Sequence, residues 1–160
     1  MSASSAVATL PSGSVLHPIR AILGAWLICG TLDGLSALAI SGVKFGIVFQ
    51  FIASALIGPN SFKGGTATVF LGIGIHYSIA LTATLVYYAA SRALPILLAR
   101  ALPFGVLYGI VVHLAMQFVV LPMTTLGRRP FHARGFFLQL AVHMIVVGPS
   151  IALSLRRFSR

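Results

Sequence analysis

Long apolar stretches, each about the length of a membrane-crossing helix, dominate the pattern of hydrophobic and polar positions along this chain. A helix needs about 20 residues to cross a hydrocarbon core about 30 Å thick. Because backbone polar groups in lipid must be paired within their own segment, we expect these stretches to be α-helices. The predicted spans cover residues 21–40, 66–89, 103–121 and 135–155. Arginines and lysines mark their ends, as is usual where helices leave the hydrocarbon.

One apolar segment, FGIVFQFIASALI at residues 45–57, is shorter than the others and ends before the helix breakers Gly58 and Pro59. This length is typical of a helix that lies in the membrane surface or re-enters the membrane. The alternative is a fifth span, which would place the two chain ends on opposite sides of the membrane.

The first 16 residues are rich in Ser and Ala and lack the basic region of a signal peptide. We expect a disordered tail over residues 1–16 and a single transmembrane domain over residues 17–160. The predicted fold is therefore all-α, an integral membrane four-helix bundle with one short interfacial or re-entrant helix after the first span.

The composition supports a membrane location. Hydrophobic residues make up 58% of the chain and charged residues only 8%, whereas soluble domains carry about 25% charged residues. The net charge of +10 comes from basic residues scattered between apolar runs, without the stripe or stacking platform of a nucleic-acid-binding surface. We therefore expect the lipid bilayer and anionic lipid headgroups as partners, and no nucleic acid.

The basic residues also bear on orientation. On a four-span topology, one side carries six basic residues and the other five, and the six lie on the side of both termini. The positive-inside rule then places both termini in the cytoplasm. The six are Arg20, Arg92, Arg100, Arg156, Arg157 and Arg160, and the five are Lys44, Lys63, Arg128, Arg129 and Arg134.

Two absences in the sequence exclude several enzyme classes. Cys29 is the single cysteine, so no internal disulfide or dithiol redox pair can form. Glutamate is absent and Asp33 is the one acidic residue, which excludes His-Glu metalloproteases and mechanisms that need two carboxylates. The sequence predicts no catalytic residue and no enzymatic reaction.

Each predicted span holds one ionisable residue in its interior, namely Asp33, His76, His113 and His143. Counted from the same membrane side, each lies about seven to ten residues from its helix end, or roughly 10–15 Å deep. We therefore expect one polar layer near the bilayer centre. Because a charged carboxylate at this depth costs at least about 2.5–3.5 kcal/mol, Asp33 is a functional candidate.

A second pair of polar residues follows the same spacing. Gln117 is four residues after His113, and Gln139 is four residues before His143. Residues four apart share a helix face, and a short loop makes the third and fourth spans antiparallel. The spacing predicts a ladder in which His113 is level with His143 and Gln117 is level with Gln139.

Small residues accompany these polar positions. Gly30 and Gly34 flank Asp33, and Gly105 and Gly109 lead into His113 on one helix face. Small residues at this spacing let helix backbones approach closely. We expect these glycines on packed faces, with the polar groups turned away from lipid.

Several functions fit this pattern. The favoured one is proton-coupled transport or signalling, in which the Asp33 and histidine layer handles protons. Two cofactor alternatives remain open: a haem with His113 and His143 as axial ligands, and a metal held by three histidines and Asp33. A further alternative has no chemistry, since interhelical hydrogen bonds of about 0.6 kcal/mol can serve as glue. The chain would then be an accessory subunit or scaffold of a larger membrane complex, or a homo-oligomer.

Several motifs carry a resemblance to a known group of proteins. They are HPIRAILGAW from His17, FIASALIGPNSFKGGTAT from Phe51, LGIGIHYSIA from Leu71, YGIVVHLAMQFVVLP from Tyr108 and HMIVVGPSIAL from His143. With these motifs the chain resembles small bacterial membrane proteins that have four predicted spans and no assigned function. The resemblance implies a multi-pass protein of the bacterial inner membrane. It supplies no activity and no site residues.

Overall fold

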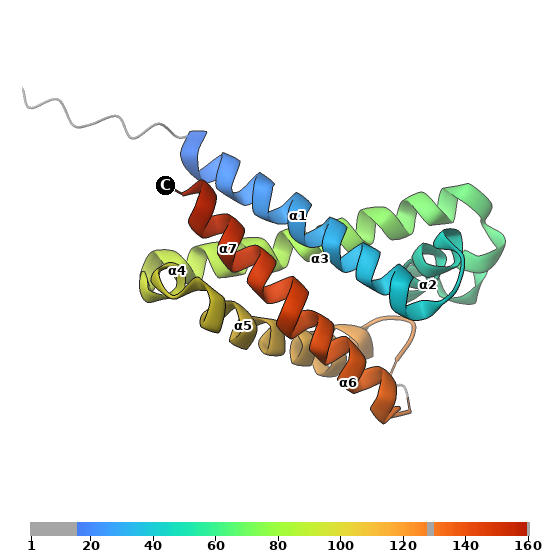
Figure 1. The fold of residues 1–160 in the computed structure, drawn as a ribbon. Coiled ribbons are helices and arrows are strands. Elements are labelled where there is room, and N and C mark those ends of the chain that lie inside the picture. Colours follow the sequence, from blue (N-terminus) through green and yellow to red (C-terminus); the bar gives the residue numbers. More distant parts are fainter. Residues whose placement is uncertain (1–15, 128–129, 160) are drawn as a thin grey trace, which may run out of the picture.

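The computed structural model describes residues 16–127 and 130–159, and this part of the chain is helical throughout, with short connections (Figure 1). The α-helices are α1 (Leu16–Ser41), α2 (Phe45–Ile57), α3 (Gly65–Ala93), α4 (Ile96–Ala99), α5 (Ala101–Ala115), α6 (Ala133–Val142) and α7 (Gly148–Phe158). The predicted tail lies outside the described residues, except for its last residue, which opens α1. The prediction of an all-α fold is confirmed for the described part.

Three of the long helical segments contain turns that are not α-helical. A π-helix (Met116–Val120) and a 3₁₀ turn (Leu121–Met123) extend α5. Another π-helix (His143–Val147) joins α6 to α7, so that Ala133–Phe158 forms one continuous helical segment. In the third of these segments, a 3₁₀ helix (Gly58–Lys63) prolongs α2.

Five helical segments in the described residues are long and apolar enough to cross a membrane: Pro18–Ser41, Phe45–Lys63, Gly65–Ala93, Ala101–Met123 and Ala133–Phe158. This set is typical of a multi-pass membrane protein. The second segment reaches that length because the 3₁₀ helix extends α2, whose own bounds match the predicted short helix. The number of four crossings and the surface position of α2 stay predictions.

Neighbouring long helices run antiparallel. Gly24 near the start of α1 meets Phe158 at the end of α7, and Cys29 meets Val147. On α5, Gly105 faces Ala152 and Gly109 faces His143, which is again antiparallel. We call the end that holds the start of α1, the end of α3, α4 and the end of α7 the terminal end. It lies on the left in Figure 1.

At the opposite end, α2 packs against the start of α3. A Cβ on Gly72 would overlap the carbonyl of Phe49, so the two backbones touch. Thr125, in the turn after α5, donates its backbone N–H to the Ala55 carbonyl at 3.0 Å and its hydroxyl to the Ser54 carbonyl. We call this the loop end, because α2 and the 121–127 turn together close it.

The interior is built largely from small side chains, and the large apolar side chains point outward. The buried core groups residues from four helices: Ala21, Ala25, Cys29, Tyr87, Ala101, Val147, Ile151, Ala152 and Leu155. Large apolar residues such as Phe70 and Ile145 are exposed. Close packing of small residues with an apolar outer surface is the arrangement expected of helices in lipid.

Candidate functional site

His113 and His143 meet where α5 crosses the π-helix between α6 and α7. Their ring centroids are 5.1 Å apart, with an interplanar angle of 64°. Phe136 of α6 packs against His113 from another direction, at 4.7 Å. His113 is only 2% exposed. Its Nε2 is buried and, within the described part of the chain, has no hydrogen-bond partner.

His143 has one ring nitrogen engaged. Its Nδ1 lies 2.8 Å from the Gln139 carbonyl, one turn earlier in the same segment. Because a carbonyl only accepts, Nδ1 of a neutral His143 carries the proton and donates. Its Nε2 is then left with a lone pair that can accept a proton.

Close backbone contact holds the two imidazoles in place. A Cβ on Gly109 would overlap the His143 carbonyl, and a Cβ on Gly148 would overlap the Gly105 carbonyl. Only glycine fits at these positions, because any side chain would push α5 away from α7. The position of His113 beside His143 therefore depends on glycines in both segments.

Prolines account for the π-helices on either side of the pair. Pro122 and Pro149 each lie two residues after the last residue of a π-helix. Proline has no N–H to bond the carbonyl four residues back, and its ring crowds that carbonyl. Those carbonyls belong to Ile145 and Phe118, each inside a π-helix. Such interruptions of the α-helical ladder often occur at functional sites.

His76 of α3 has a different environment. Its Nε2 pairs with the Gly30 carbonyl of α1 at 2.8 Å, and it is 9% exposed. Phe49 and Tyr77 contact its ring edge to face. Gly34 lies against the same ring nitrogen, so Gly30 and Gly34 of α1 both contact α3. His76 is thus a satisfied link between α1 and α3.

Asp33 lies on α1 between Gly30 and Gly34, the two glycines that contact α3. It is half-buried, and within the described residues no hydrogen bond or ion pair to its carboxylate is found. Cys29, one turn earlier, donates its thiol to the Val147 carbonyl with a sulfur–oxygen distance of 3.8 Å. The structure therefore brings His113 and His143 together, but it does not bond Asp33 to any of the three histidines.

The predicted glutamine ladder does not form in the described residues. Gln117 is half-buried, Gln139 is exposed, and Gln139 contributes its backbone carbonyl to His143 instead of its side chain. Gln117 lies inside the π-helix that starts at Met116. Because a π-turn has more residues than an α-turn, the i, i+4 spacing no longer places Gln117 on the face of His113.

The cofactor alternatives fit this geometry poorly. The described residues contain no group of three or more metal-ligating side chains close enough for one ion, so a site of three histidines and Asp33 is not assembled. The contact between the rings of His113 and His143 leaves no gap for a porphyrin between them. A haem held axially by this pair would require the two helices to separate.

A groove of about 470 Å³ lies between α1 and α7, beside this site. It is lined by Leu32, Leu35, Ser36, Ala39, Ile145, Val146, Pro149, Ser150 and Leu153. The two serine hydroxyls already donate to carbonyls of their own helices, at 2.8 and 2.9 Å. The groove is therefore a mainly apolar outer surface in which both serine hydroxyl protons are already engaged.

Sequence patterns missed two features of the site. The Gly148-Pro149 pair shapes the π-helix and the contact with α5, and Phe136 encloses His113. A Gly-Pro pair five residues after a buried histidine is the signal that points to the first. No protein family, curated protein or solved structure matches this chain. Its function is therefore argued from these residues.

Proposed function

We propose that this chain is a small multi-pass membrane protein in which the pair His113 and His143 takes up and releases a proton, for proton-coupled transport or signalling. The supporting observation is the buried Nε2 of His113, which has no hydrogen-bond partner in the described residues and lies beside a second imidazole. Burying a polar group without a hydrogen bond costs about 1–3 kcal/mol. A hydrophobic residue would avoid this cost, and for this reason we assign the imidazole a chemical role.

The pair can hold one proton between two bases. With Nδ1 of His143 donating to the Gln139 carbonyl, its Nε2 can accept from a protonated neighbour. A second proton is opposed by repulsion between two like charges at this separation, which is strong in a medium of low dielectric constant. The shared proton would attract α5 to the segment of α6 and α7, and its loss would loosen that contact.

The two π-helices supply the place where such a change can be absorbed. They interrupt the hydrogen-bond ladder next to both histidines, and helices bend at such interruptions. Asp33 is the second proton-handling group in this proposal. Cys29 links its helix to Val147, the last residue of the π-helix that His143 opens. His76 is structural, because the Gly30 carbonyl already satisfies it.

Proton flux into proteoliposomes tests transport. The purified full chain is reconstituted with an internal pH-sensitive dye, and a potassium diffusion potential drives protons inward. We expect flux above that of empty vesicles, and at least a tenfold loss in His113→Gln and His143→Gln. His132→Gln is the matched control, because His132 is exposed in the connection before α6.

Histidine NMR tests the pair without requiring transport. In the wild type, His113 and His143 should titrate together, and His143→Gln should change the titration of His113 but leave that of His76 in place. Independent titration of His113 and His143 overturns the shared-proton proposal. Coupled titration without flux rejects transport and retains signalling.

An accessory subunit or scaffold without proton chemistry is the competing function. The GxxxG faces, Gly30 with Gly34 and Gly105 with Gly109, and the basic helix ends suit this function as well. Inside the folded chain these glycines are already covered, Gly30 by the ring of Tyr77 and Gly105 by the backbone of α7. They therefore offer no free surface to a partner helix.

A further inference from the structure

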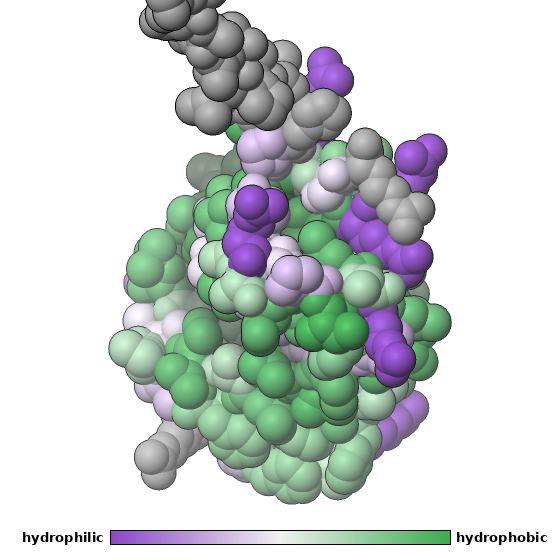
Figure 2. All heavy atoms as spheres, turned by 90° about the vertical axis from the view of Figure 1, so that its left-hand side faces the viewer, coloured by the Kyte–Doolittle hydropathy of each residue, from purple (hydrophilic) through white to green (hydrophobic). Residues whose placement is uncertain are grey.

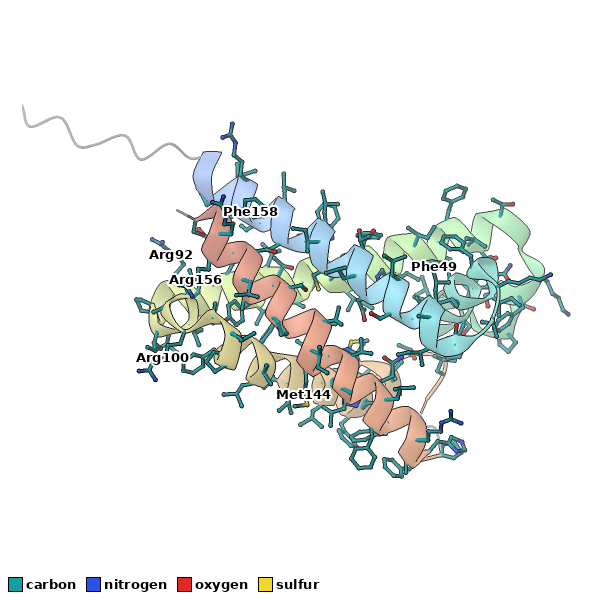
Figure 3. The ribbon with its side chains drawn as sticks, in the orientation of Figure 1. Phe49, Arg92, Arg100, Met144, Arg156 and Phe158 are labelled. Carbon is teal, nitrogen blue, oxygen red and sulfur yellow. The ribbon has the colours of Figure 1, made fainter. Side chains whose placement is uncertain are left out.

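Five arginines gather at the terminal end of the molecule. They come from four different places in the chain: Arg20 in α1, Arg92 near the end of α3, Arg100 before α5, and Arg156 and Arg157 in the last turn of α7. Figure 3 shows Arg92, Arg100 and Arg156 around α4 at this end. Figure 2, which looks onto the same end, shows hydrophilic residues separated by apolar surface.

No acidic side chain lies in this cluster. Asp33, the one acidic residue of the chain, is 13 residues beyond Arg20 along α1, or about 20 Å away at 1.5 Å per residue. Within residues 16–127 and 130–159, no hydrogen bond or ion pair to these five guanidinium groups is found. Their donors are free for a ligand from outside the protein.

Apolar side chains lie between the arginines. The connection from α3 through α4 to α5 exposes Leu94, Ile96 and Leu102, with exposed fractions of 55%, 45% and 56%. Arg92 and Arg100 flank Leu94 and Ile96 in the sequence, and Leu102 follows two residues after Arg100. A free phosphate ion would need only the charges, whereas arginines beside exposed leucine and isoleucine side chains match a molecule with both an anionic head and a hydrocarbon part.

The surface is anchored to the bundle. The Tyr87 hydroxyl donates to the Leu97 carbonyl of α4 at 3.0 Å, and Tyr108 packs edge to face against Tyr87 at 4.9 Å. The Arg100 backbone N–H also bonds the Ile96 carbonyl at 2.9 Å. Because the connection is held in this way, ligand binding does not require the free-energy cost of ordering the backbone that carries Arg92 and Arg100.

We propose that the terminal end binds the phosphate of an anionic phospholipid, with its acyl chains on the exposed leucines of the α3–α4–α5 connection. The guanidinium group presents a planar fork that can pair with two phosphate oxygens at once. Arginine and lysine are enriched on the cytoplasmic side of membrane proteins, where anionic lipids are abundant. The proposal therefore also places this end, and both chain termini, in the cytoplasm.

The loop end supplies a matched control of equal charge. Among the described residues it carries Lys44, Lys63 and Arg134, of which two are lysines that act as point charges. A triple variant there removes the same charge as a triple variant at Arg92, Arg100 and Arg156.

The experiment measures binding of phosphatidylglycerol to the full chain in mild detergent by native mass spectrometry. We expect R92Q/R100Q/R156Q to weaken binding at least tenfold, and K44Q/K63Q/R134Q to weaken it less than threefold. Phosphatidylcholine should bind equally to all three proteins, and inorganic phosphate at equal concentration should not displace phosphatidylglycerol. Circular dichroism melting checks that each variant is folded.

Two outcomes overturn the proposal. Equal weakening by both triple variants would mean that only the total charge matters, and displacement by inorganic phosphate would mean a site for the free ion. If the terminal triple variant does not fold, R92K/R100K replaces it, because it keeps the charge and removes the fork. A fivefold loss is then expected, and wild-type affinity in this variant contradicts a role for the fork.

Discussion

Two buried histidines, His76 and His113, lie in similar settings and differ in one atom's surroundings. Each is on a long apolar helix, packs edge to face against aromatic rings, and contacts a neighbouring helix through glycine-lined crossings. The Gly30 carbonyl receives Nε2 of His76 at 2.8 Å, whereas Nε2 of His113 has no partner in the described residues. At the first crossing the His76 ring nitrogen is hydrogen-bonded, whereas at the second the Nε2 of His113 has no hydrogen-bond partner in the described residues.

The difference shows what decides the role of a histidine in a helix bundle. Gly30 carries no side chain, so its carbonyl is open to α3 even though it is part of a helix. At the second crossing, the neighbouring segment presents another imidazole, His143, where α1 presents a carbonyl. On the proposed function, a hydrogen-bonded contact and a proton-exchanging pair thus arise from one type of packing with different neighbours.

The largest effect is expected from removing the second crossing altogether. In Gly148→Ala the new Cβ would overlap the Gly105 carbonyl and approach the Gly109 backbone nitrogen. Two backbones must separate, so we expect a loss of about 3 kcal/mol in the free energy of unfolding, at the upper end of the usual cost of overpacking. Unfolding by sodium dodecyl sulfate in mixed micelles, followed by circular dichroism, measures it.

Gly74→Ala is the matched control for this variant. Gly74 is also helical, but it is exposed and nothing lies within 4 Å of an added Cβ. The control should be neutral or more stable by up to about 1 kcal/mol, because alanine favours the helix. A similar loss in both glycine variants would show that the close contact of α5 with α7 is not what stabilises this part of the molecule.

A smaller effect is expected at the first crossing. His76→Phe keeps the ring contacts with Phe49 and Tyr77 but removes the hydrogen bond to the Gly30 carbonyl. We expect the free energy of unfolding to fall by about 1 kcal/mol. The same detergent titration measures this loss, and a wild-type value would mean that the bond contributes nothing to stability.

The smallest effect on stability is expected from His113→Phe. No hydrogen bond to Nε2 is lost among the described residues, and an apolar ring can occupy the space beside Phe136. The free energy of unfolding should stay within about 0.5 kcal/mol of wild type or rise. If this variant is destabilised as much as His76→Phe, the distinction between the two histidines fails.

Helix positions were predictable because lipid leaves the backbone few choices. The second span was predicted at residues 66–89 and is found within α3, Gly65–Ala93. The level of His113 with His143 also followed from spacing, because a short loop forces antiparallel helices.

The atomic details of the site were not predictable in the same way. The carbonyl that satisfies His76 and the missing partner of His113 depend on side-chain orientation, which periodicity does not determine. The glutamine ladder assumed regular α-helices, and Pro122 and Pro149 interrupt that regularity beside Gln117 and His143. Proline positions in a span should therefore be considered before residues four apart are assigned to one face.

Cys29 can report how often α1 separates from the segment that holds Val147. It is the single thiol of the chain, it is 1% exposed, and it is closed off where α1 meets Val147. A small membrane-permeant maleimide can modify it only when these helices part, so the labelling rate reports how often they separate. Because no cysteine has to be introduced or removed, the rate of helix separation can be measured on the native chain at different pH values and in different lipids.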